Sequence, residues 1–445
     1  MYLTLIGATI ERVMENKTYQ KPRGTRDILP EEQIYWRYLN SCAEDTLFGL
    51  GFSKIDTPIF EDKDIFVRGI GTATDIVEKE IFSISESGDD DPKYALRPEG
   101  TAGVVRAYIE NGMSSWPQPV RLFYTGQMFR RERPQQGRLR EHRQIGLEIL
   151  GDPSAKSDFL AIISALEILK KSGFSDFIVS INSIGCPQCR PKYIDKLKEY
   201  YSKKLKDSCE DCQRRFNLNP LRLLDCKNDD CQKIKEDAPQ ILDFLCKECQ
   251  DHFQDILGYL DDFDIKFLLD TKLVRGLDYY TKTVFEISAI GDESRKTTLC
   301  GGGRYDSLVS TLGGIATPAV GWGMGADRVI EELKKNKIVP AKIRGIEVYL
   351  IQLGKTTKPI CKKIYNELKK SAINVYYIPS DDSLRSLLKD AAKLKVPTTV
   401  IIGQQEASAG RAIVRDLNSG SQEELKIAEA IEKIKKKYSR QKPAC

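Results

Sequence analysis

Histidine is the residue type that this 445-residue chain most nearly lacks. Only His142 and His252 are present, which argues against a mechanism built on histidine general bases and against a metal cage of histidines. Long apolar runs are also missing, since no uninterrupted stretch approaches the roughly 20 residues that a membrane-spanning helix needs. Arginines, carboxylates and the substrates must therefore supply any chemistry, and we expect no membrane association.

Two further absences concern targeting and charge. The first residues carry no basic segment ahead of an apolar core, so they do not form a secretory signal, and we expect a cytoplasmic protein. The formal net charge of +5 is too small to indicate a nucleic-acid partner. Basic residues do gather near the end of the chain, where such a run can contact phosphate or form a solvated helix end: Lys433, Lys435, Lys436, Lys437, Arg440 and Lys442.

The length predicts two to four domains. Phe159, Ile162, Leu166 and Leu169 recur at helical spacing, and residues 177–182 form a strand pattern. Strands alternate with helices after residue 345, which predicts a small, largely parallel α/β domain. We therefore expect an α/β multidomain protein with an N-terminal tail (1–20), a large mixed domain (21–344) that contains a cysteine-rich insertion (185–262), a small α/β domain (345–432) and a basic tail (433–445).

The densest signal is residues 120–150, where two alternating strand patterns flank a polar, glycine-containing loop. This arrangement predicts an antiparallel hairpin. Gln144, Gly146 and Glu148 share one face, and the glycine leaves open space between two polar groups. The other strand ends at Arg130, and the loop adds further arginines. Guanidinium groups bind phosphate oxygens in pairs, so the hairpin suits a nucleoside triphosphate beside a small ligand, although a surface hairpin with solvated arginines is the alternative.

Three other segments carry polar side chains at turns. Glu99 and Thr101 lie where a strand ends and a helix begins, in position to hold a cationic amine. Residues 273–286 place Arg275 near two tyrosines, and residues 318–330 form a glycine-rich strand that enters a helix. The glycines at 321 and 323 imitate a dinucleotide-binding pattern. The following strand ends in Ile351 and Gln352 rather than the required acid, which disfavours a nicotinamide site.

Together these segments resemble class II aminoacyl-tRNA synthetases. The hairpin is similar to motif 2, residues 51–58 to motif 1, and residues 318–330 to motif 3. The run Arg-Gly-Leu-Asp-Tyr-Tyr-Thr at 275–281 resembles the histidine-specific motif of histidyl-tRNA synthetases, and residues 300–306 also fit that family. The resemblance covers roughly residues 21–432. It implies a class II antiparallel-sheet catalytic domain, with the helical, cysteine-rich insertion, followed by an α/β anticodon-binding domain.

The resemblance also implies an activity and its residues. ATP with Mg²⁺ would activate L-histidine, with release of pyrophosphate, and the histidyl group would pass to the 3′ end of tRNA(His). A homodimer is implied because motif 1 resembles an interface element. The histidine pocket would contain Glu99, Gly100, Thr101, Gln144, Glu148, Tyr279 and Tyr280. ATP would contact Arg130, Glu132, Arg138 and Arg328, and Arg130 and Arg275 would be catalytic, with Arg275 at the α-phosphate.

The physical chemistry agrees with this activity. Positioned cations can stabilise the charge that develops during attack of a carboxylate on a phosphate, so no histidine base is needed. Imidazole offers one donor and one acceptor, which Glu148 and a tyrosine hydroxyl can both read; such a pocket rejects analogues by about 10⁴-fold without editing. In one departure from the family, Asp327 stands where glutamate usually precedes the arginine of motif 3, and we expect a changed local geometry there.

Cysteine is concentrated in the insertion. Three pairs have zinc-ligand spacing: Cys186 and Cys189, Cys209 and Cys212, and Cys246 and Cys249. Cys226 and Cys231 form a looser fourth pair. In a cytoplasmic protein such thiols are more typical of metal ligands than of disulfides, and a tetrahedral site takes four thiolates. Two pairs would form one structural zinc site and four pairs would form two, whereas buried free thiols that pack as small hydrophobes are the alternative.

Two other functions compete with the ligase. A catalytically idle paralogue of this fold serves as a regulatory subunit of ATP phosphoribosyltransferase, but it typically lacks the C-terminal α/β domain and has a degraded histidine-specific motif. Both features are intact in this sequence. A zinc-ribbon protein that binds nucleic acid would explain the cysteines but leaves the remaining motifs unexplained.

Overall fold

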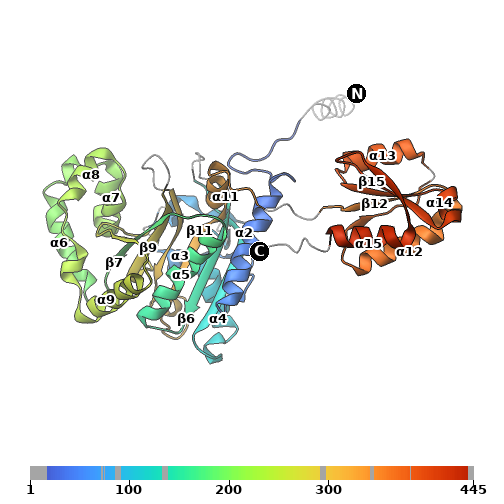
Figure 1. Cartoon of the computed structure of the whole chain (residues 1–445). Helices are drawn as coiled ribbons and strands as arrows, with labels where there is room; N and C mark the ends of the chain where they lie inside the picture. Colours follow the sequence, from blue (N-terminus) through green and yellow to red (C-terminus); the bar gives the residue numbers. More distant parts are fainter. Residues whose placement is uncertain are drawn as a thin grey trace, which may run out of the picture. The chain divides into compact units, whose positions relative to one another are not determined.

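The chain divides into two compact units, an N-terminal unit (Met1–Val339) and a C-terminal unit (Pro340–Cys445), whose elements are labelled in Figure 1. The computed structural model describes residues 18–71, 74, 76–85, 92–132, 139–290, 297–340, 345–380 and 382–438. Within those ranges no helix combines the length and apolar character needed to cross a bilayer.

A large, mainly antiparallel sheet forms the centre of the N-terminal unit. Parallel pairing occurs only at its two edges among the described residues, between β1 and β5 and between β7 and β8. The strands in spatial order are β1 (Ser53–Lys54), β5 (Val120–Phe129), β6 (Glu141–Leu150), β11 (Ala319–Gly325), β10 (Thr297–Arg304), β9 (Thr281–Ala289), β7 (Phe177–Ser183) and β8 (Phe267–Leu269). A small sheet beside it has the order β2 (Phe60–Asp62), β4 (Tyr94–Leu96) and β3 (Phe82–Ile84).

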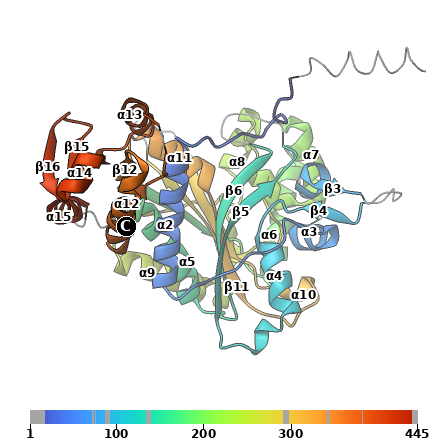
Figure 2. The same cartoon turned by 90° about the vertical axis from the view of Figure 1, so that its right-hand side faces the viewer.

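Helices cover one face of the large sheet and bury the main hydrophobic core. They are α2 (Gln33–Gly49), α5 (Ala155–Lys171), α9 (Lys247–Asp262) and α11 (Ala326–Lys335). Figure 2 shows α2, α5 and α11 on the same side of β5, β6 and β11. The predicted helical stripe explains how α5 packs, because Ile162, Leu166 and Leu169 are buried in this core. Phe159, at the start of the stripe, is partly buried against the same core and also contacts Phe263, with ring centroids 4.9 Å apart.

The opposite face carries a second core that surrounds the polar site. Its elements include α4 (Thr101–Glu110) and α10 (Leu308–Thr311), with α3 (Lys63–Ile70) packed on both. The insertion adds α6 (Arg190–Ser202), α7 (Glu210–Leu218) and α8 (Asp229–Glu236), and short turns at Pro220–Asp225 and Ile241–Phe244. These helices, green to yellow in Figure 1, lie between β7 and β8 in sequence. Because β7 and β8 pair in parallel, the insertion is the crossover between two adjacent strands.

A buried ion pair joins the large sheet to α5 and lies beside α9. Arg304, the last residue of β10, donates from Nε to both carboxylate oxygens of Asp158 on α5, at 3.2 and 3.0 Å. Both side chains are fully buried. The guanidinium group also donates to the carbonyl oxygens of Asp152 and Ser154, each at 3.0 Å. His252 Nε2 on α9 lies 3.4 Å from Asp158 Oδ1, so the pair connects the sheet, α5 and the end of the insertion.

The C-terminal unit is a five-stranded sheet with its own cores. Its strands in order are β13 (Val375–Tyr376), β12 (Val348–Gln352), β14 (Thr398–Ile402), β15 (Arg411–Asp416) and β16 (Gln422–Lys426). One core contains side chains of α12 (Lys358–Lys370) and α15 (Ile427–Tyr438), and the other those of α13 (Leu384–Lys393); α14 (Gln404–Ala409) lies beside β15.

The structure corrects the sequence analysis at one place in this unit and selects between its alternatives at another. The first three strands are parallel as predicted, but β15 and β16 form an antiparallel hairpin that the pattern did not indicate. Its second strand, Gln-Glu-Glu-Leu-Lys, is almost entirely exposed and so lacks an apolar alternation. The first four lysines of the basic run lie within α15, which continues to Tyr438, whereas Arg440 and Lys442 lie outside the described residues.

Candidate active site

The motif 2 hairpin forms the floor of the site. β5 and β6 pair antiparallel over their full lengths, with Tyr124 opposite Gly146 and Leu122 opposite Glu148, as the sequence pattern predicted. The tip, residues 133–138, lies outside the described residues, and with it Arg133 and the predicted ATP contact Arg138.

Glu148 is the centre of a buried polar cluster. Its Oε1 accepts a hydrogen bond from Thr101 Oγ1 at 2.7 Å, and its Oε2 accepts one from the Tyr305 hydroxyl. The side chain is inaccessible to solvent, and this burial raises the pKa of the carboxyl from 4.5 to about 8, although the hydrogen bonds from Tyr305 and Thr101 oppose the shift. A carboxyl group in this state gains from any ligand that donates a hydrogen bond to its ionised form.

Glu99 lies two residues before the helix α4 and supports the same cluster. Its carboxylate accepts the backbone N–H groups of Thr101 at 2.7 Å and Ala102 at 2.8 Å, so it occupies the N-terminal end of the helix as a capping acid does. Burial raises the pKa of Glu99, and the two backbone hydrogen bonds lower it. Two carboxyl groups thus meet in one enclosed polar space, where a cationic or hydrogen-bond-donating ligand would be stabilised.

Aromatic side chains enclose this space. Tyr279 lies against Tyr280 and Tyr305, with ring centroids 4.7 and 5.5 Å apart. The ring of Tyr124 covers Gly146 so closely that a Cβ atom there would lie 2.1 Å from the ring. The space predicted above Gly146 is therefore occupied by Tyr124, whose hydroxyl accepts a hydrogen bond from Gln144 Nε2 at 3.1 Å. The structure brings all the predicted histidine-pocket residues into this cluster: Glu99, Gly100, Thr101, Gln144, Glu148, Tyr279 and Tyr280.

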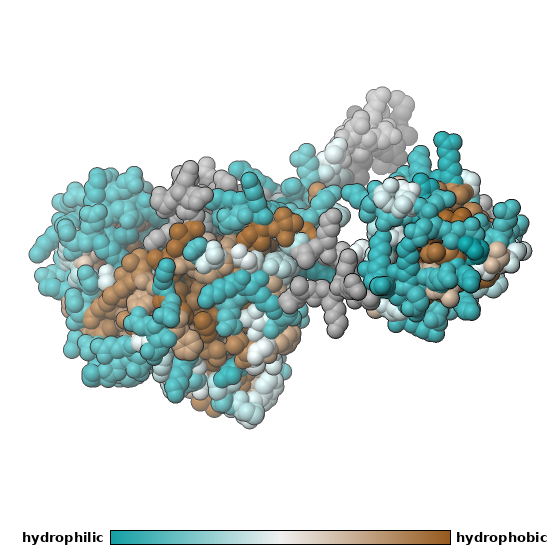
Figure 3. Space-filling view, viewed as in Figure 1, coloured by the Kyte–Doolittle hydropathy of each residue, from teal (hydrophilic) through white to brown (hydrophobic). Residues whose placement is uncertain are grey.

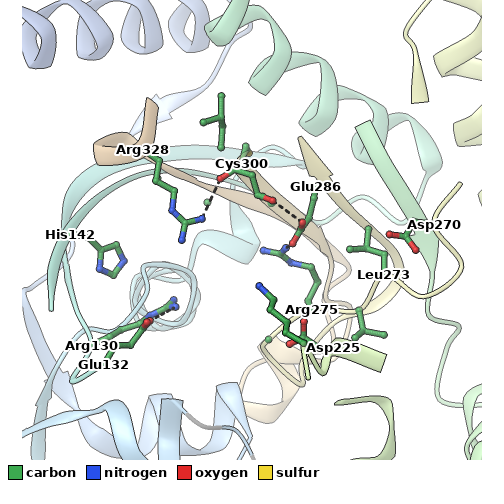
Figure 4. Close-up of a pocket in the computed structure, with 18 of the residues that line it drawn as sticks. Arg130, Glu132, His142, Asp225, Asp270, Leu273, Arg275, Glu286, Cys300 and Arg328 are labelled. Carbon is green, nitrogen blue, oxygen red and sulfur yellow. Dashed lines mark hydrogen bonds and ion pairs between the residues drawn. The ribbon is translucent and has the colours of Figure 1, made fainter. Parts of the chain in front are cut away.

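Three arginines from separate elements face a cavity of about 780 Å³ that adjoins the cluster at Gln144. Figure 4 shows Arg130, Arg275 and Arg328 directed into the same space. Arg130 extends β5 and donates from Nε to the carbonyl oxygen of Pro98 at 2.9 Å. Arg328, in the first turn of α11, donates to the carbonyl oxygen of Thr298 at 3.2 Å. Arg275 pairs with Glu286, while Glu132 lines the cavity 4.0 Å from Arg130.

Two of these arginines act on a neighbouring imidazole. His142 lies on its wall between two of the arginines (Figure 4). Burial, followed by the charges of Arg130 and Arg328, lowers the pKa of His142 from 6.5 to about 3. The imidazole is therefore neutral at physiological pH, and the arginines provide the charge. Acidic side chains such as Asp225 and Asp270 line the cavity as well, so an anionic ligand such as a polyphosphate would be held by direct contact with the guanidinium groups rather than by the net charge of the cavity.

Glycines on β10 and β11 create the room that these side chains occupy. A Cβ atom at Gly321 would lie 1.9 Å from Glu148 Oε2, and one at Gly323 would lie 2.3 Å from Gln144 Nε2. A Cβ atom at Gly301 would lie 2.5 Å from the Arg275 guanidinium. The glycine pattern that imitates a dinucleotide site thus has a different cause, namely close approach of functional side chains to the strands.

Sequence reasoning left out several residues of the cluster. Tyr305 contacts Glu148 directly, although the two residues are 157 positions apart in the sequence. Only the run Gly-Gly-Gly-Arg-Tyr, which ends at Tyr305, could have indicated it. Two supports of the Arg275 loop were also missed: Arg222 donates to the carbonyl oxygen of Arg275 at 3.0 Å, and Asn219 donates to Asp278 at 2.6 Å. Both residues lie in the insertion, which the sequence analysis interpreted only as a metal-binding segment.

Asp327, the departure in motif 3, has partners of its own. One carboxylate oxygen accepts from Arg26 Nη2 at 2.9 Å and the other from the backbone N–H of Arg143 at 2.6 Å. The shorter acid therefore ties α11 to the start of β6 and to residue 26, and it leaves Arg328 directed toward the cavity.

The eight thiols of the insertion form two separate groups. Cys186, Cys189, Cys246 and Cys249 lie together, as do Cys209, Cys212, Cys226 and Cys231, and within each group all sulfur atoms are within 4.8 Å of one another. The described cysteines are all free thiols. This partition selects one of the arrangements that the sequence left open, because the first pair meets the last and the two middle pairs meet each other.

Known proteins resemble this chain both in sequence and in fold. The sequence model of the histidyl-tRNA synthetase family matches residues 24–329, and that of an anticodon-binding domain matches residues 347–437. A histidine–tRNA ligase of Dehalococcoides mccartyi is 42% identical over 94% of this chain and 99% of its own length. The crystal structure of apo histidyl-tRNA synthetase from S. aureus is 30% identical, covers 94% of this chain and 100% of its own, and superposes with a TM-score of 0.77.

The fold is also shared outside the synthetases proper. A Bacillus halodurans structure titled as an ATP phosphoribosyltransferase regulatory subunit/histidyl-tRNA synthetase covers 87% of this chain at 22% identity, with a TM-score of 0.59. At that identity the likeness shows the fold alone.

The antiparallel sheet, its hairpin floor and the arginine-lined cavity are those of a class II aminoacyl-tRNA synthetase. Within that class, the family match and the relatives at about two-fifths identity are decisive. The chain belongs to the histidyl-tRNA synthetase family, a family of ligases, which confirms the fold class and the family predicted from the sequence.

Replacing Glu148 with glutamine should stabilise the fold in a pH-dependent way. In the folded protein the pKa of Glu148 is raised from 4.5 to about 8. The protonated carboxyl therefore contributes fully to the free energy of unfolding of the wild-type protein below pH 4.5, and this contribution is lost as the pH rises through 8. Glu148→Gln removes that loss. Thermal unfolding should therefore show a larger gain in Tm over wild type at pH 8 than at pH 5.

Thr101→Val is a control for the same experiment, because it removes a hydrogen bond to Glu148 without removing the titrating group. It should lower Tm at both pH values. A gain for Glu148→Gln that is equal at pH 5 and pH 8 would contradict the assignment of the raised pKa to this residue.

Proposed function

We propose that this chain activates L-histidine with ATP and transfers the histidyl group to the 3′ end of tRNA(His). The observation that carries this proposal is the juxtaposition of two binding environments: a buried carboxyl and tyrosine cluster meets a cavity faced by three arginines, with Gln144 at the junction. The first environment suits a small polar cation and the second suits a nucleoside triphosphate. Adenylation of an amino acid requires both ligands side by side.

The histidine side chain would be read by Glu148 and a tyrosine hydroxyl. Neutral imidazole has one N–H donor and one acceptor nitrogen; the Glu148 carboxylate accepts from the first, and a hydroxyl of Tyr279 or Tyr280 donates to the second. Glu99, with Thr101 and Gln144, would hold the α-ammonium group. A buried site left with unpaired groups by a wrong amino acid rejects it by about 10⁴-fold or more.

The three arginines would hold ATP and stabilise the charge that develops in the reaction. A carboxylate oxygen of histidine attacks the α-phosphorus, the bond to the β-phosphate oxygen breaks, and pyrophosphate leaves. Arg275 lies against Gly301 of the glycine-rich strand β10 and would contact the α-phosphate, whereas Arg130 and Arg328 would contact the other phosphates. Glu132 and Arg138 complete the predicted ATP contacts. Mg²⁺ would enter with ATP and supply further positive charge at the phosphates.

Transfer to tRNA would use the C-terminal unit for recognition. This unit matches an anticodon-binding domain over residues 347–437, and its last helix is rich in lysine. In the second step a hydroxyl at the 3′ end of the tRNA attacks the carbonyl carbon of the adenylate, and AMP leaves. The regulatory paralogue typically lacks this unit, so the ligase is the better-supported function. The predicted cytoplasmic location stays a prediction.

A homodimer is part of the proposal. Large apolar side chains are exposed near motif 1 and the adjacent edge of the sheet: Phe48 at 54%, Ile59 at 46%, Phe60 at 54% and Trp116 at 47%. On the face drawn in Figure 3, hydrophobic residues also cover part of the surface of the N-terminal unit. Exposed apolar patches of this kind mark interaction surfaces, and a twofold dimer is the commonest assembly of identical chains. Structural zinc in residues 185–262 is also part of the proposal, supported by the two groups of four thiols.

ATP–pyrophosphate exchange measured with each of the twenty amino acids tests the first step. Only L-histidine should support exchange. Arg275→Ala should lower kcat by about 10²- to 10³-fold, the usual effect of removing a group that stabilises transition-state charge. Arg68→Ala is the matched control, because Arg68 is exposed and pairs only with its helix neighbour Asp64 among the described contacts. Equal rates for Arg275→Ala and Arg68→Ala, with both proteins folded, would remove the catalytic role.

Truncation after Arg344 tests the division of labour between the two units. Each unit has hydrophobic cores of its own, so we expect the shortened protein to fold. It should keep histidine-dependent exchange and lose most tRNA charging. In the full chain, log affinity for tRNA should fall by roughly 0.7 to 0.9 per neutralised phosphate per decade of salt. A parallel fall of exchange and charging would show that the division is wrong.

Sedimentation equilibrium tests the dimer. The wild-type protein should sediment at twice the mass of one chain, and Phe60→Lys should shift it toward the monomer, because a charge placed in an apolar interface costs desolvation. Phe263→Lys is the control, since Phe263 is comparably exposed but lies at the end of α9, away from motif 1. A fully active wild-type monomer would refute the proposed assembly.

A further inference from the structure

The four-thiol groups have the spacing of occupied zinc sites. In the first group, Cys186 Sγ lies 3.7 Å from Cys189 Sγ and 3.8 Å from Cys246 Sγ, and Cys189 Sγ lies 3.9 Å from Cys249 Sγ. In the second, Cys209 Sγ lies 3.7 Å from Cys226 Sγ. Four sulfurs placed tetrahedrally at about 2.3 Å from a zinc ion are about 3.8 Å apart, whereas a disulfide requires about 2.05 Å. The distances fit a shared ion and exclude disulfides.

The local backbone favours thiolates at both groups. Cys189, Cys209 and Cys246 each immediately precede a helix, and Cys212 and Cys249 lie in the first turn of α7 and α9. The positive end of a helix stabilises a thiolate. Backbone N–H groups also point at sulfur, from Cys186 to Cys189 Sγ at 3.2 Å and from Cys209 to Cys231 Sγ at 3.3 Å. Such donors orient and tune metal-bound sulfur.

The first group is connected directly to the tyrosines of the candidate histidine pocket. Arg190, next to Cys189, donates to the carbonyl oxygen of Tyr280 at 2.6 Å and to those of Ile184 and Gly185 at 3.0 and 3.1 Å. Glu248, between Cys246 and Cys249, accepts from Lys282 Nζ at 2.7 Å. Both pairs of this group therefore hold the same short segment, 280–282.

The second group is connected to the residues that come just before that segment, Arg275 and Asp278. The chain between Cys212 and Cys226 carries Asn219 and Arg222, which bind the Asp278 side chain and the Arg275 carbonyl oxygen. Cys226 itself lines the arginine cavity. Thiols on either side of these two residues would fix them through a single ion.

We propose that the two groups bind one zinc ion each through four thiolates and that the two ions together position the segment 275–282, which carries Arg275, Tyr279 and Tyr280. The inference rests on the proposed function for the role of that segment, but its metal part does not. The ions touch no substrate. Arg190 and Arg222 are positioning residues that transmit the order of the metal sites to the pocket.

Metal analysis of the full-length protein, purified without chelators from zinc-replete medium, tests the sites. We expect two zinc ions per chain in the wild-type protein and one zinc ion per chain in the variants Cys249→Ser and Cys212→Ser. The control Cys361→Ser, which removes a buried thiol of the C-terminal unit, should keep two zinc ions per chain. Wild-type protein grown with Co²⁺ should show the visible absorption of tetrahedral thiolate cobalt, a measurement that does not depend on folding of the variants. One ion per chain or fewer, or no such absorption, overturns the proposal.

Histidine-dependent exchange by Arg190→Leu tests the coupling. This variant should keep two zinc ions and raise KM for histidine on the order of tenfold with little change in kcat, since it loses charge-assisted hydrogen bonds that place Tyr280. Arg190→Lys should recover part of the loss. Lys196→Leu is the control, because the ion pair of Lys196 goes to Glu199 on the same exposed face of α6, outside the segment. An unchanged KM in Arg190→Leu overturns the positioning role.

The two proposals fail in different ways. Wild-type protein with two zinc ions but no histidine-dependent exchange would overturn the proposed function and leave the metal sites standing. Wild-type protein with normal exchange and no zinc would overturn the metal proposal alone.

Discussion

The buried pair of Arg304 and Asp158 is the constraint from which the rest of the site is built. Neither side chain has access to solvent, so removal of one would leave the other as an uncompensated buried charge, a loss of about 3–5 kcal/mol. Arg304 ends β10 and Asp158 lies on α5, which fixes the strand against the helix. The next residue, Tyr305, is thereby directed at Glu148, and His252 brings the last helix of the insertion to the same point. One ion pair thus orients the pocket, the sheet and the insertion.

Around this fixed point the site separates two electrostatic tasks. The carboxyl and tyrosine cluster is enclosed, and burial raises the pKa values of Glu99 and Glu148 because it penalises their charged forms. The neighbouring cavity is open to a large anion and is faced by guanidinium groups. The strands β10 and β11 keep both environments close together, since their glycines admit side chains from β6 and from the Arg275 segment. A ligand in the first space and a ligand in the second would meet at Gln144.

Local patterns in the sequence predicted what depends on near neighbours. The hairpin β5–β6 and the core helix α5 follow from alternation or helical spacing within a dozen residues. The histidine-pocket residues came from resemblance to a family, because nothing in their spacing brings residue 99 to residue 280. Tyr305 was missed because its partner is 157 positions away. The exposed strand β16 has too few apolar residues to be recognised. Cysteine spacing predicted pairs, but only the fold shows that the first pair joins one that is 60 residues away.

The place of the insertion as a crossover between β7 and β8 also bears on the order in which the chain folds. Contacts between residues far apart in sequence form slowly, because the loop between them must be closed first, and large chains fold from the N-terminus during synthesis. β6 leaves the ribosome long before its neighbour β11, and the whole insertion is made in the interval. Glu148 therefore has β5 beside it, but neither Tyr305 nor β11, until the cysteine-rich helices have been synthesised. The supply of metal to the nascent insertion would then precede, and condition, the closure of the sheet on which the active site is assembled.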